Sequence, residues 1–430
     1  MASKFQVPRG TRDILPGESE RWEALESRTR DILSRYGYRE VRTPIFESTD
    51  LFVRSVGEAT DIVRKELYTF EDRKGRSLTL RPECTAPLVR AYLEHSLGHG
   101  EPATRLYYIG PMFRYERPQA GRYRQFWQIG AELLGPAQPA ADAEMIDLFV
   151  ALLRGVGLGD IRVLLNSLGD ATCRPTYRDR IREHFAAREA ALCEDCKERL
   201  RTNPLRILDC KVPSCQDAIA SAPSVLDALC EPCRDHFRGV NEALDALGIE
   251  HETAPRLVRG LDYYTRTVFE VHAAGLGAQN AVGGGGRYDQ LVREFGGPQT
   301  PAIGFSIGME RLLLATGGLE GDQALRPDVC VVSLTPEASL EALALARELR
   351  GLDAAGPGIR AMADVSGRSS SAQMKWASKI QARYVVFVPS DPEGYAVRDM
   401  EAGQDLGKMR SAEAIRERLL GRTSMAGRTP

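Results

Sequence analysis

Two neighbouring segments, 105–116 and 122–134, combine arginine, glutamate, glutamine and an aromatic residue in a pattern that predicts a polar ligand site. Both have the composition of strands, and the polar turn 117–121 between them predicts a long β-hairpin. Residues two apart in a strand point to the same face. One face of the second strand should therefore carry Arg124, Phe126, Gln128, Gly130 and Glu132, and one face of the first strand Arg114 and Glu116.

Such a face suits chemistry better than packing. Arginine binds phosphate through paired hydrogen bonds, an aromatic ring stacks on a planar base, and carboxylates bind an ammonium group or Mg²⁺. One interpretation is therefore the floor of a site for a charged ligand. The other is the solvent-facing side of an edge hairpin, because antiparallel sheets commonly leave one face to water.

Several local elements must position this hairpin. Apolar residues spaced by three and four predict a helix over 17–36. Alternation then predicts a strand over 41–45, crossed by Pro44, and a short strand is expected over 77–81. The next helix should begin near Thr85, a plausible N-cap, and end near residue 96.

Later segments change in character. Residues 171–250 are helical and charged in pattern and hold seven of the nine cysteines, which predicts an inserted small domain. The run Gly283–Gly286 is most simply a tight turn. After the boundary Leu325–Pro327, strands and helices alternate, which predicts a small α/β domain.

Composition bounds the classes of function. Lys and Arg total 57 against 59 for Asp and Glu, a net charge of -2, which excludes a nucleic-acid binder that works by global positive charge but leaves room for a local basic patch. Neither the P-loop spacing nor the dinucleotide fingerprint occurs. No secretory signal and no run of ~20 apolar residues is present, so we expect a cytoplasmic protein without a membrane span.

Four separated motifs resemble the class II aminoacyl-tRNA synthetases, in their histidyl, bacterial-type branch. Gly110–Gln119 with Gly121–Phe126 resembles motif 2, Leu257–Tyr264 the histidine-specific signature, and Gly304–Leu312 motif 3. Leu80–Glu83 with Thr85–Ala86 resembles the amino-acid loop. Residues 36–48 resemble the motif 1 segment, through which the family forms homodimers. The identity and order of the motifs agree along most of the chain.

The resemblance implies an α+β fold: a class II antiparallel sheet with flanking helices over 1–325, a helical cysteine-bearing insertion over about 171–250, and an α/β anticodon-binding domain over 326–420. Residues 421–430 are expected to form a disordered tail. The implied reaction joins histidine to tRNA(His) through histidyl-adenylate, with ATP as substrate and Mg²⁺ beside it. A synthetase-like regulatory subunit of histidine biosynthesis is the alternative, although such paralogues tend to lose the histidine signature or the C-terminal domain.

The resemblance also implies roles for individual residues. Arg259 and Arg114 would be catalytic, gripping the substrate carboxylate and the α-phosphate. The residues expected to bind histidine are Glu83, Cys84, Thr85, Arg114, Gln128, Glu132, Arg259, Tyr263 and Tyr264. Those expected to bind ATP are Arg114, Glu116, Arg122, Phe126 and Arg311, with Glu116 close to the Mg²⁺. Cys84 and Pro87 depart from the family pattern, in which a glycine is usual at the position of Cys84.

Two further patterns stay open. Cys193-x-x-Cys196 and Cys230-x-x-Cys233, with Cys210, Cys215 and His236 nearby, have the spacing of a structural zinc site, but reduced and partly buried thiols are the alternative interpretation. Basic residues around the second helix of the C-terminal domain would contact tRNA, or form an ordinary solvated stripe. They are Arg368, Lys375, Lys379 and Arg383.

Overall fold

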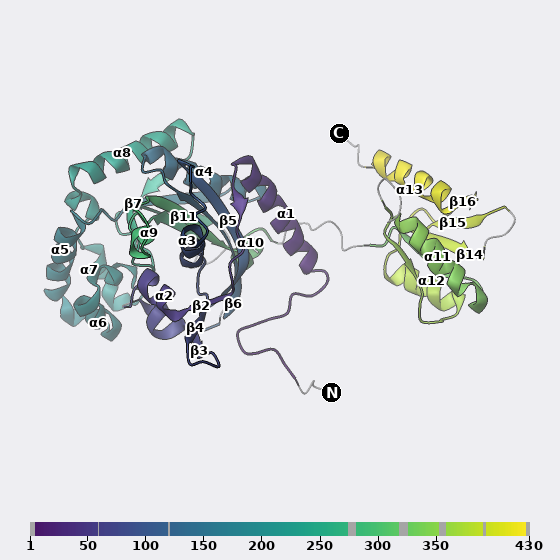
Figure 1. Ribbon diagram of the computed structural model, residues 1–430, viewed down its shortest axis with the longest axis horizontal. Helices are drawn as coiled ribbons and strands as arrows, with labels where there is room; N and C mark the ends of the chain where they lie inside the picture. Colours follow the sequence, from purple (N-terminus) through teal and green to yellow (C-terminus); the bar gives the residue numbers. More distant parts are fainter. Residues whose placement is uncertain are drawn as a thin grey trace. The chain divides into compact units, whose positions relative to one another are not determined.

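The computed structural model describes residues 5–58, 60–118, 121–273, 281–317, 326–351, 358–389 and 393–426. Its contacts divide the chain into two units, Met1–Gly321 and Asp322–Pro430, each of which is described by itself (Figure 1). None of the helices in the described part of the chain is long and apolar enough to cross a membrane.

Among the described residues, eight strands of the first unit form one sheet in the order β1-β5-β6-β11-β10-β9-β7-β8. The inner pairs are antiparallel, and only the outer pairs, β1 with β5 and β7 with β8, are parallel. The strands are β1 (Arg39–Glu40), β5 (Thr104–Phe113), β6 (Gln125–Leu134), β7 (Ile161–Ser167), β8 (His251–Thr253), β9 (Thr265–Ala273), β10 (Ala281–Arg287) and β11 (Ala302–Gly308). This is the antiparallel α+β architecture expected from the sequence.

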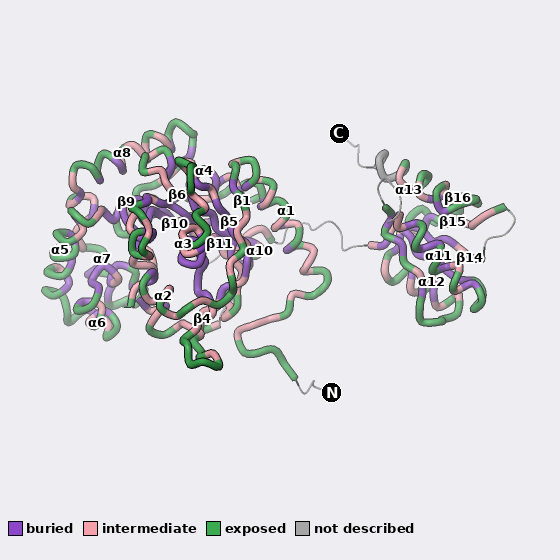
Figure 2. The backbone as a smooth tube through the Cα atoms, in the orientation of Figure 1, coloured by how far each residue is buried: buried purple, intermediate pink, exposed green. Residues whose placement is uncertain are grey.

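Helices cover one face of this sheet and build the main core. They are α1 (Ser19–Arg35), α4 (Pro139–Gly155), α8 (Glu231–Ala246) and α10 (Met309–Ala315). Phe149 of α4 lies edge-on to Phe269 and Phe305 of the sheet, with ring centroids 5.7 and 4.9 Å apart. Figure 2 shows that the central strands are mostly buried. The opposite face carries a smaller core under α3 (Thr85–Glu94) and α9 (Leu291–Glu294), and this face holds the site.

A buried ion pair joins three elements of the main core. Arg287, at the end of β10, donates hydrogen bonds from Nε and Nη2 to the carboxylate of Asp142 on α4. His236 Nε2 of α8 lies 3.2 Å from Asp142 Oδ1. All three side chains are buried, so the charges have left water and depend on one another for compensation.

The four glycines expected to form a tight turn instead form the middle of strand β10. The prediction was wrong because the four glycines allow a close approach of strands rather than a reversal of the chain. A Cβ at Gly285 would collide with the carbonyl oxygen of Gly304, and one at Gly286 would lie 2.6 Å from the carbonyl oxygen of Thr267. The backbones of β9 and β11 therefore lie so close to β10 that there is no room for a Cβ atom at these positions.

A small antiparallel sheet lies beside the large one. Its strands are β2 (Phe46–Ser48), β3 (Tyr68–Glu71) and β4 (Ser77–Leu80), and β4 lies between the other two. Helix α2 (Thr49–Val56) and a π-helical turn (Ile62–Glu66) connect its strands. The strand predicted over 41–45 is not formed, because the extended backbone around Pro44 has only isolated partners. Pairing occurs instead on either side, in β1 and β2.

The insertion folds around a core of its own. Its helices are α5 (Arg174–Ala186), α6 (Glu194–Thr202) and α7 (Gln216–Ala220), linked by 3-10 turns, and Figure 1 shows them gathered at one end of the unit. Helix α8, although it falls within 171–250, packs on α4 through Val240 and Leu244 and belongs to the main core.

The second unit has the predicted alternation. Its five-stranded sheet runs in the order β13-β12-β14-β15-β16, parallel on one side of β14 and antiparallel on the other. The elements are β12 (Val329–Ser333), α11 (Ser339–Arg350), β13 (Ala361–Ala363), α12 (Ser370–Lys379), β14 (Tyr384–Val388), β15 (Tyr395–Asp399), β16 (Gln404–Met409) and α13 (Ala412–Ala426). The tail was expected to begin at residue 421, but helix α13 continues to Ala426; residues 427–430 lie outside the described part.

Candidate active site

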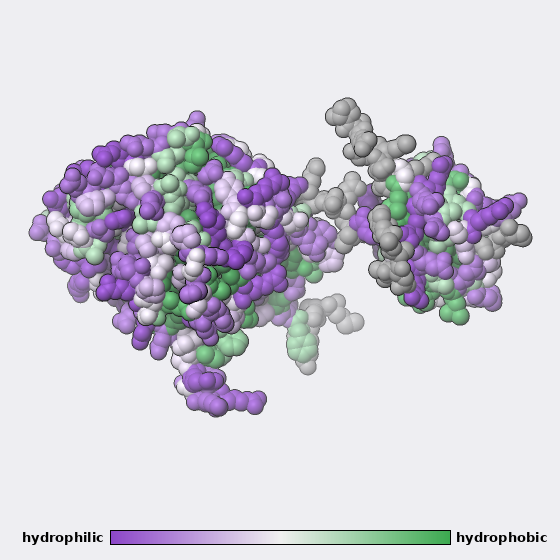
Figure 3. Space-filling view, turned by 45° about the horizontal axis from the view of Figure 1, so that its top comes forward, coloured by the Kyte–Doolittle hydropathy of each residue, from purple (hydrophilic) through white to green (hydrophobic). Residues whose placement is uncertain are grey.

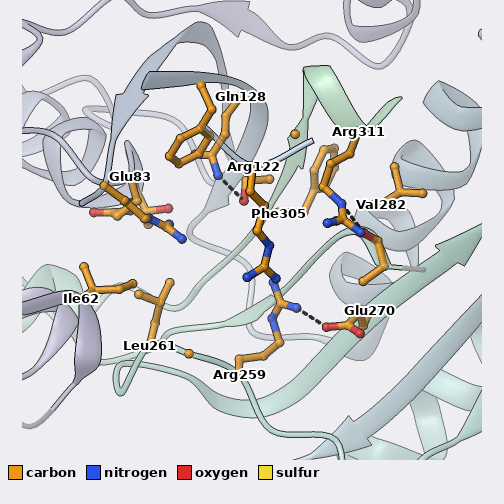
Figure 4. Close-up of a pocket in the computed structure, with 18 of the residues that line it drawn as sticks. Ile62, Glu83, Arg122, Gln128, Arg259, Leu261, Glu270, Val282, Phe305 and Arg311 are labelled. Atoms are coloured by element: carbon orange, nitrogen blue, oxygen red, sulfur yellow. Dashed lines mark hydrogen bonds and ion pairs between the residues drawn. The ribbon is translucent and has the colours of Figure 1, made fainter. Parts of the chain in front are cut away.

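A cavity of about 620 Å³ opens on the face of the large sheet opposite α4. Twelve of the thirteen residues proposed from the sequence line it: Glu83, Thr85, Arg114, Glu116, Arg122, Phe126, Gln128, Glu132, Arg259, Tyr263, Tyr264 and Arg311. They come from the start of α3, the β5–β6 hairpin, the loop before β9 and the start of α10, and Figure 4 shows several of them pointing into the pocket.

The alternation predicted for β6 holds. Phe126, Gln128 and Glu132 face the cavity, whereas Trp127 points to the other side and packs edge-on against Trp22 at 6.0 Å. Arg124 lies just before the strand and does not share this face. Its guanidinium stacks on the ring of Tyr115, 3.8 Å from the centroid, outside the cavity lining.

One end of the cavity is a network of buried hydroxyls and carboxylates. Thr85 Oγ1 donates to Glu132 Oε1 at 2.7 Å, and Tyr288 Oη donates to Glu132 Oε2 at 2.6 Å. The carboxylate of Glu83 accepts from the backbone N–H groups of Thr85 (2.7 Å) and Ala86 (3.1 Å). Glu83 therefore caps α3, and Thr85, expected as the N-cap, is free to orient Glu132.

Burial dominates the electrostatics of this end. It raises the pKa of Glu132 to about 8, although the hydrogen bonds from Tyr288 and Thr85 act in the opposite direction. Burial also raises the pKa of Glu83, against its backbone hydrogen bonds. Gly304 of β11 makes room for Glu132, because a Cβ there would collide with the carboxylate.

Gln128 and two tyrosines complete this end. Gln128 Nε2 donates a long hydrogen bond of 3.4 Å to Ser306 Oγ, and its buried Oε1 has no hydrogen-bond partner among the described residues. Tyr263 and Tyr264 lie with ring centroids 4.8 Å apart, and Tyr288 lies 5.6 Å from Tyr263. A buried amide oxygen without a partner costs free energy unless a donor reaches it, and a ligand ammonium would supply one.

Arg259 also lines the cavity. Its Nη1 donates to Glu270 Oε2 at 2.6 Å, as Figure 4 shows, and the other oxygen of Glu270 lies 2.6 Å from His272 Nε2. Burial alone would raise the pKa of Glu270, but the charges of Arg259 and His272 outweigh it and lower the pKa. Arg259 Nε is buried with no hydrogen-bond partner in the described part, so the guanidinium has donor capacity left for a ligand.

Three further arginines, Arg114, Arg122 and Arg311, line the same cavity. Arg114 donates from Nε to the carbonyl of Pro82 at 2.8 Å, and its guanidinium lies 5.3 Å from the ring of Phe126. Glu116 lies between Arg114 and Arg122, at 3.8 and 3.5 Å. Arg311 donates from Nε to the carbonyl of Ala281 at 2.8 Å. Three guanidinium groups with one carboxylate near them suit a polyanionic ligand.

Cys84 is the one proposed residue outside the lining. Its thiol is fully buried behind the cavity, 3.5 Å from Thr43 Oγ1 and 3.7 Å from Arg81 Nη1. Burial raises the pKa of this thiol to about 12, so it is a neutral packing group at ordinary pH. The substitution for glycine leaves the cavity wall intact because the side chain points away from it.

Sequence reasoning missed several lining residues. Tyr288, Glu270 and His272 contact the key groups directly, and Arg206 reaches in from the insertion to donate to the carbonyl oxygen of Arg259 at 3.1 Å. The alternation of β9 around Val268 and Phe269 could have placed Glu270 and His272 on the polar face. No local signal marks Arg206, because its place depends on how the insertion folds back.

None of the cysteines lines the cavity, and the two C-x-x-C pairs do not meet in one site. Cys193 and Cys196 lie in one cluster, and Cys230 and Cys233 lie in another. His236 joins neither, since it pairs with Asp142 in the core. A single zinc site formed by both pairs, one of the two interpretations left open by the sequence, is therefore wrong.

Comparison with known proteins gives a consistent result. A family model described as histidyl-tRNA synthetase matches residues 10–312. A histidine–tRNA ligase from Desulforamulus reducens is 50% identical over 402 residues, covering 92% of this chain and 95% of the relative. The crystal structure of apo histidyl-tRNA synthetase from S. aureus is similar with a TM-score of 0.79 and 36% identity, covering 96% of this chain and 99% of that one.

A third likeness concerns the fold alone. A structure from Bacillus halodurans C, described as an ATP phosphoribosyltransferase regulatory subunit/histidyl-tRNA synthetase, is similar with a TM-score of 0.64 at 24% identity, covering 90% of this chain and 99% of that one. The 50% identity to the Desulforamulus reducens ligase is about twice the 24% identity to this structure, and the family assignment therefore rests on the ligase.

The raised pKa of Glu132 predicts a specific pH dependence of stability. The folded protein holds this proton up to about pH 8, whereas the unfolded chain releases it near pH 4.5. Between these values the folded state binds more protons, so the free energy of unfolding should fall as pH rises, by up to about 1.4 kcal/mol per pH unit from this group. Glu132→Gln should lack this decline in histidine-free protein.

Urea unfolding at pH 5.5 and 7.5, followed by tryptophan fluorescence, measures the effect, since Trp22 and Trp127 both lie in the first unit. Wild type should lose stability relative to Glu132→Gln at the higher pH. Equal pH dependences of the two proteins would show that the Glu132 carboxyl ionises normally.

Proposed function

The chain belongs to the histidyl-tRNA synthetase family and is a histidine–tRNA ligase, and from this premise we propose how its cavity residues carry out the reaction. One observation supports the proposal above all: Arg259, a group of buried polar side chains and three further arginines line a single cavity. An amino acid in the pocket and a triphosphate on the arginines would meet at this guanidinium. The assignment as a non-catalytic regulatory subunit is not favoured, because the relatives at about half identity are ligases.

The polar end would bind histidine. Gln128 Oε1 and the carboxylate of Glu83 can accept hydrogen bonds from the α-ammonium group, together with the hydroxyl of Thr85. Glu132, held by Thr85 and Tyr288, and Tyr264 would contact the two imidazole nitrogens, with Tyr263 beside them. A ligand without those nitrogens leaves buried polar groups unpaired, which is a strong basis for discrimination.

The first step needs no protein nucleophile. An oxygen of the histidine carboxylate attacks the α-phosphorus of ATP, the bond to the bridging oxygen of the β-phosphate breaks, and diphosphate leaves. Arg259 and Arg114 would bring the two anionic groups together and stabilise the charge that accumulates on the α-phosphate oxygens. Glu270 fixes the orientation of Arg259 through its 2.6 Å ion pair. In the second step, a terminal ribose hydroxyl of tRNA attacks the carbonyl carbon and AMP leaves.

The arginine-rich end would bind ATP. Phe126 offers a ring face for adenine, Arg122 lies near the triphosphate, and Arg311 would contact the γ-phosphate. Mg²⁺ commonly binds through substrate phosphates plus one or two carboxylates. Glu116 is the carboxylate between Arg114 and Arg122 and is suited to that role, in which the metal neutralises phosphate charge.

The cytoplasmic location expected from the sequence stays a prediction.

Substitution of Arg259 tests this arrangement. Arg259→Ala should lower histidine-dependent ATP–diphosphate exchange by about 10²–10³-fold, because a charge-stabilising donor is lost at the reacting centre, while tRNA affinity is retained. The matched control is Arg293→Ala, an exposed arginine of α9 outside the cavity lining, which should exchange like wild type.

Exchange is measured with each of the twenty amino acids. Wild type should respond to histidine alone. Exchange driven by another amino acid would contradict the pocket assignment, and an Arg259→Ala rate within a few-fold of wild type would remove Arg259 from catalysis.

The second unit is proposed to bind the anticodon of tRNA. Lys375 and Lys379 of α12 are exposed, one turn apart, and their charges are available for phosphates. Arg368 is partly engaged with Asp364 at 2.6 Å and stacks on Trp376 at 5.0 Å, and Arg383 lies 3.7 Å from Glu401. The two lysines therefore carry this part of the proposal.

Reversal of those charges should weaken tRNA binding selectively. Lys375→Glu with Lys379→Glu should raise the Kd for tRNA(His) about tenfold or more at low salt, with a weaker salt dependence, while ATP–diphosphate exchange is unchanged. Filter binding at several salt concentrations measures it. An unchanged Kd would show that α12 is an ordinary solvated helix.

Homodimer formation through the motif 1 region is also proposed. Figure 3 shows a largely hydrophilic surface on the visible face, against which exposed apolar side chains are informative. Ile45, Phe46 and Phe70 are 44%, 47% and 43% exposed on and beside the small sheet, and the two phenylalanine rings lie 6.3 Å apart. Adjacent exposed aromatic side chains are characteristic of protein interfaces.

Sedimentation analysis should give wild type a mass of two chains and Phe46→Asp with Phe70→Asp a mass of one, because two carboxylates would be buried at the contact. Leu343→Asp is the control, as an apolar residue of the second unit that is similarly exposed at 45%, and should stay dimeric. A dimeric double variant would place the interface elsewhere.

A further inference from the structure

The insertion gathers its cysteines into two separate clusters of four ligand groups. Cys193, Cys196, Cys210 and Cys215 form the first; Asp170, Cys173, Cys230 and Cys233 form the second, and in each the ligand atoms lie within 4.8 Å of one another. We propose that each cluster binds one structural zinc ion, the first through four thiolates and the second through three thiolates and the Asp170 carboxylate.

The first cluster has the dimensions of a zinc site. With Zn–S bonds of about 2.3 Å, sulfurs at the corners of a tetrahedron lie about 3.8 Å apart. Cys193 Sγ and Cys210 Sγ are 3.9 Å apart. Backbone N–H groups donate to two of the sulfurs, from Val212 to Cys210 at 3.4 Å and from Cys193 to Cys215 at 3.2 Å. Such donors favour the thiolate over the thiol.

The second cluster agrees with a mixed ligand set. With Zn–O near 2.0–2.2 Å, oxygen and sulfur ligands of a tetrahedral ion lie about 3.6 Å apart. Asp170 Oδ1 lies 3.6 Å from Cys173 Sγ and 3.7 Å from Cys230 Sγ. The backbone N–H of Thr172 donates to the same oxygen at 2.9 Å and holds it in place.

The local fold explains why the sulfurs converge. Cys193 immediately precedes α6 and Cys230 immediately precedes α8, with Cys196 and Cys233 in the first turns. Each C-x-x-C pair thus presents two sulfurs at a helix N-terminus, where the backbone dipoles favour negative charge. The remaining ligands come from segments distant in sequence, so each ion would join two parts of the chain.

Two other buried cysteines of this protein are not clustered. Cys84 and Cys330 are each buried singly, away from the other cysteines of the described part. Within the clusters the sulfurs face one another, and the 3.9 Å between Cys193 Sγ and Cys210 Sγ is well beyond a disulfide bond. Hydrophobic packing alone does not explain why four metal-ligating side chains meet at one point in each of two clusters.

The second cluster is linked to the active site. Arg266 of β9 lies 3.8 Å from Asp170 Oδ2, and Arg174, which follows Cys173, donates to the carbonyl oxygen of Tyr264 at 2.8 Å. An ion that fixes Asp170 and Cys173 would therefore hold the first turn of α5 against the loop that carries the proposed histidine-binding tyrosines.

Elemental analysis of full-length protein purified without chelator tests the proposal. Two zinc ions per chain are expected, released on titration with a mercurial that blocks thiols. Substantially less than one zinc per chain would overturn both sites, and iron in place of zinc would overturn the choice of metal.

Variants assign each ion to its cluster. Cys210→Ser with Cys215→Ser should leave one zinc per chain, as should Cys173→Ser with Cys233→Ser, while the control Cys330→Ser keeps two. Loss of both ions or of neither in a cluster variant would overturn the assignment of ligands. If a variant fails to fold, cobalt substitution of wild type decides: intense thiolate-to-cobalt charge transfer with tetrahedral d–d bands supports the proposal, and octahedral spectra contradict it.

Discussion

The close packing of strands around the glycines of β10 is the constraint on which the rest of the site depends. Because these residues have no side chains, β9 and β11 approach β10 without obstruction, and Arg259 can lie across the glycine surface at 3.1 Å from where a Gly284 Cβ would stand. Glycine backbone thus lines part of the cavity, at Gly283, Gly304 and Gly308, beside the side chains that carry the chemistry. A sheet with ordinary side chains there would fill the space that the reactants need.

Burial affects both the selectivity of the amino-acid pocket and the electrostatics of Arg259. At the amino-acid end it keeps Glu132 in a polar but poorly solvated setting, where hydrogen bonds to hydroxyls are strong and an unmatched ligand is costly. Elsewhere in the lining, the ion pair with Glu270 orients Arg259, and the pKa of Arg259 stays above its ordinary value because Tyr264 and Glu270 together outweigh the effect of burial. The same low polarisability that discriminates among amino acids also strengthens the attraction between Arg259 and an α-phosphate.

Much of this arrangement could be predicted from the sequence because it follows local periodicity. The alternation along β6 correctly separated Phe126 and Gln128 from Trp127, and strand–helix alternation identified the second unit. The errors have a common cause in tertiary context. The glycine run became a central strand because of neighbours distant in sequence, and the two C-x-x-C pairs separated because each found partners that spacing alone cannot identify.

The buried pair of Arg287 and Asp142 has a consequence for how this sheet finds its alignment. Ordinary strands are held in register by side chains that fit one face, but the four glycines of β10 have none, so its register depends on the few side chains that flank them, such as Val282 and Arg287. Arg287 stands at the end of that strand, and a shift by one residue would turn its guanidinium to the opposite face, away from Asp142 and His236. A buried ion pair thus helps to fix the register of the whole strand, and with it the position of the backbone that reaches the cavity at Gly283.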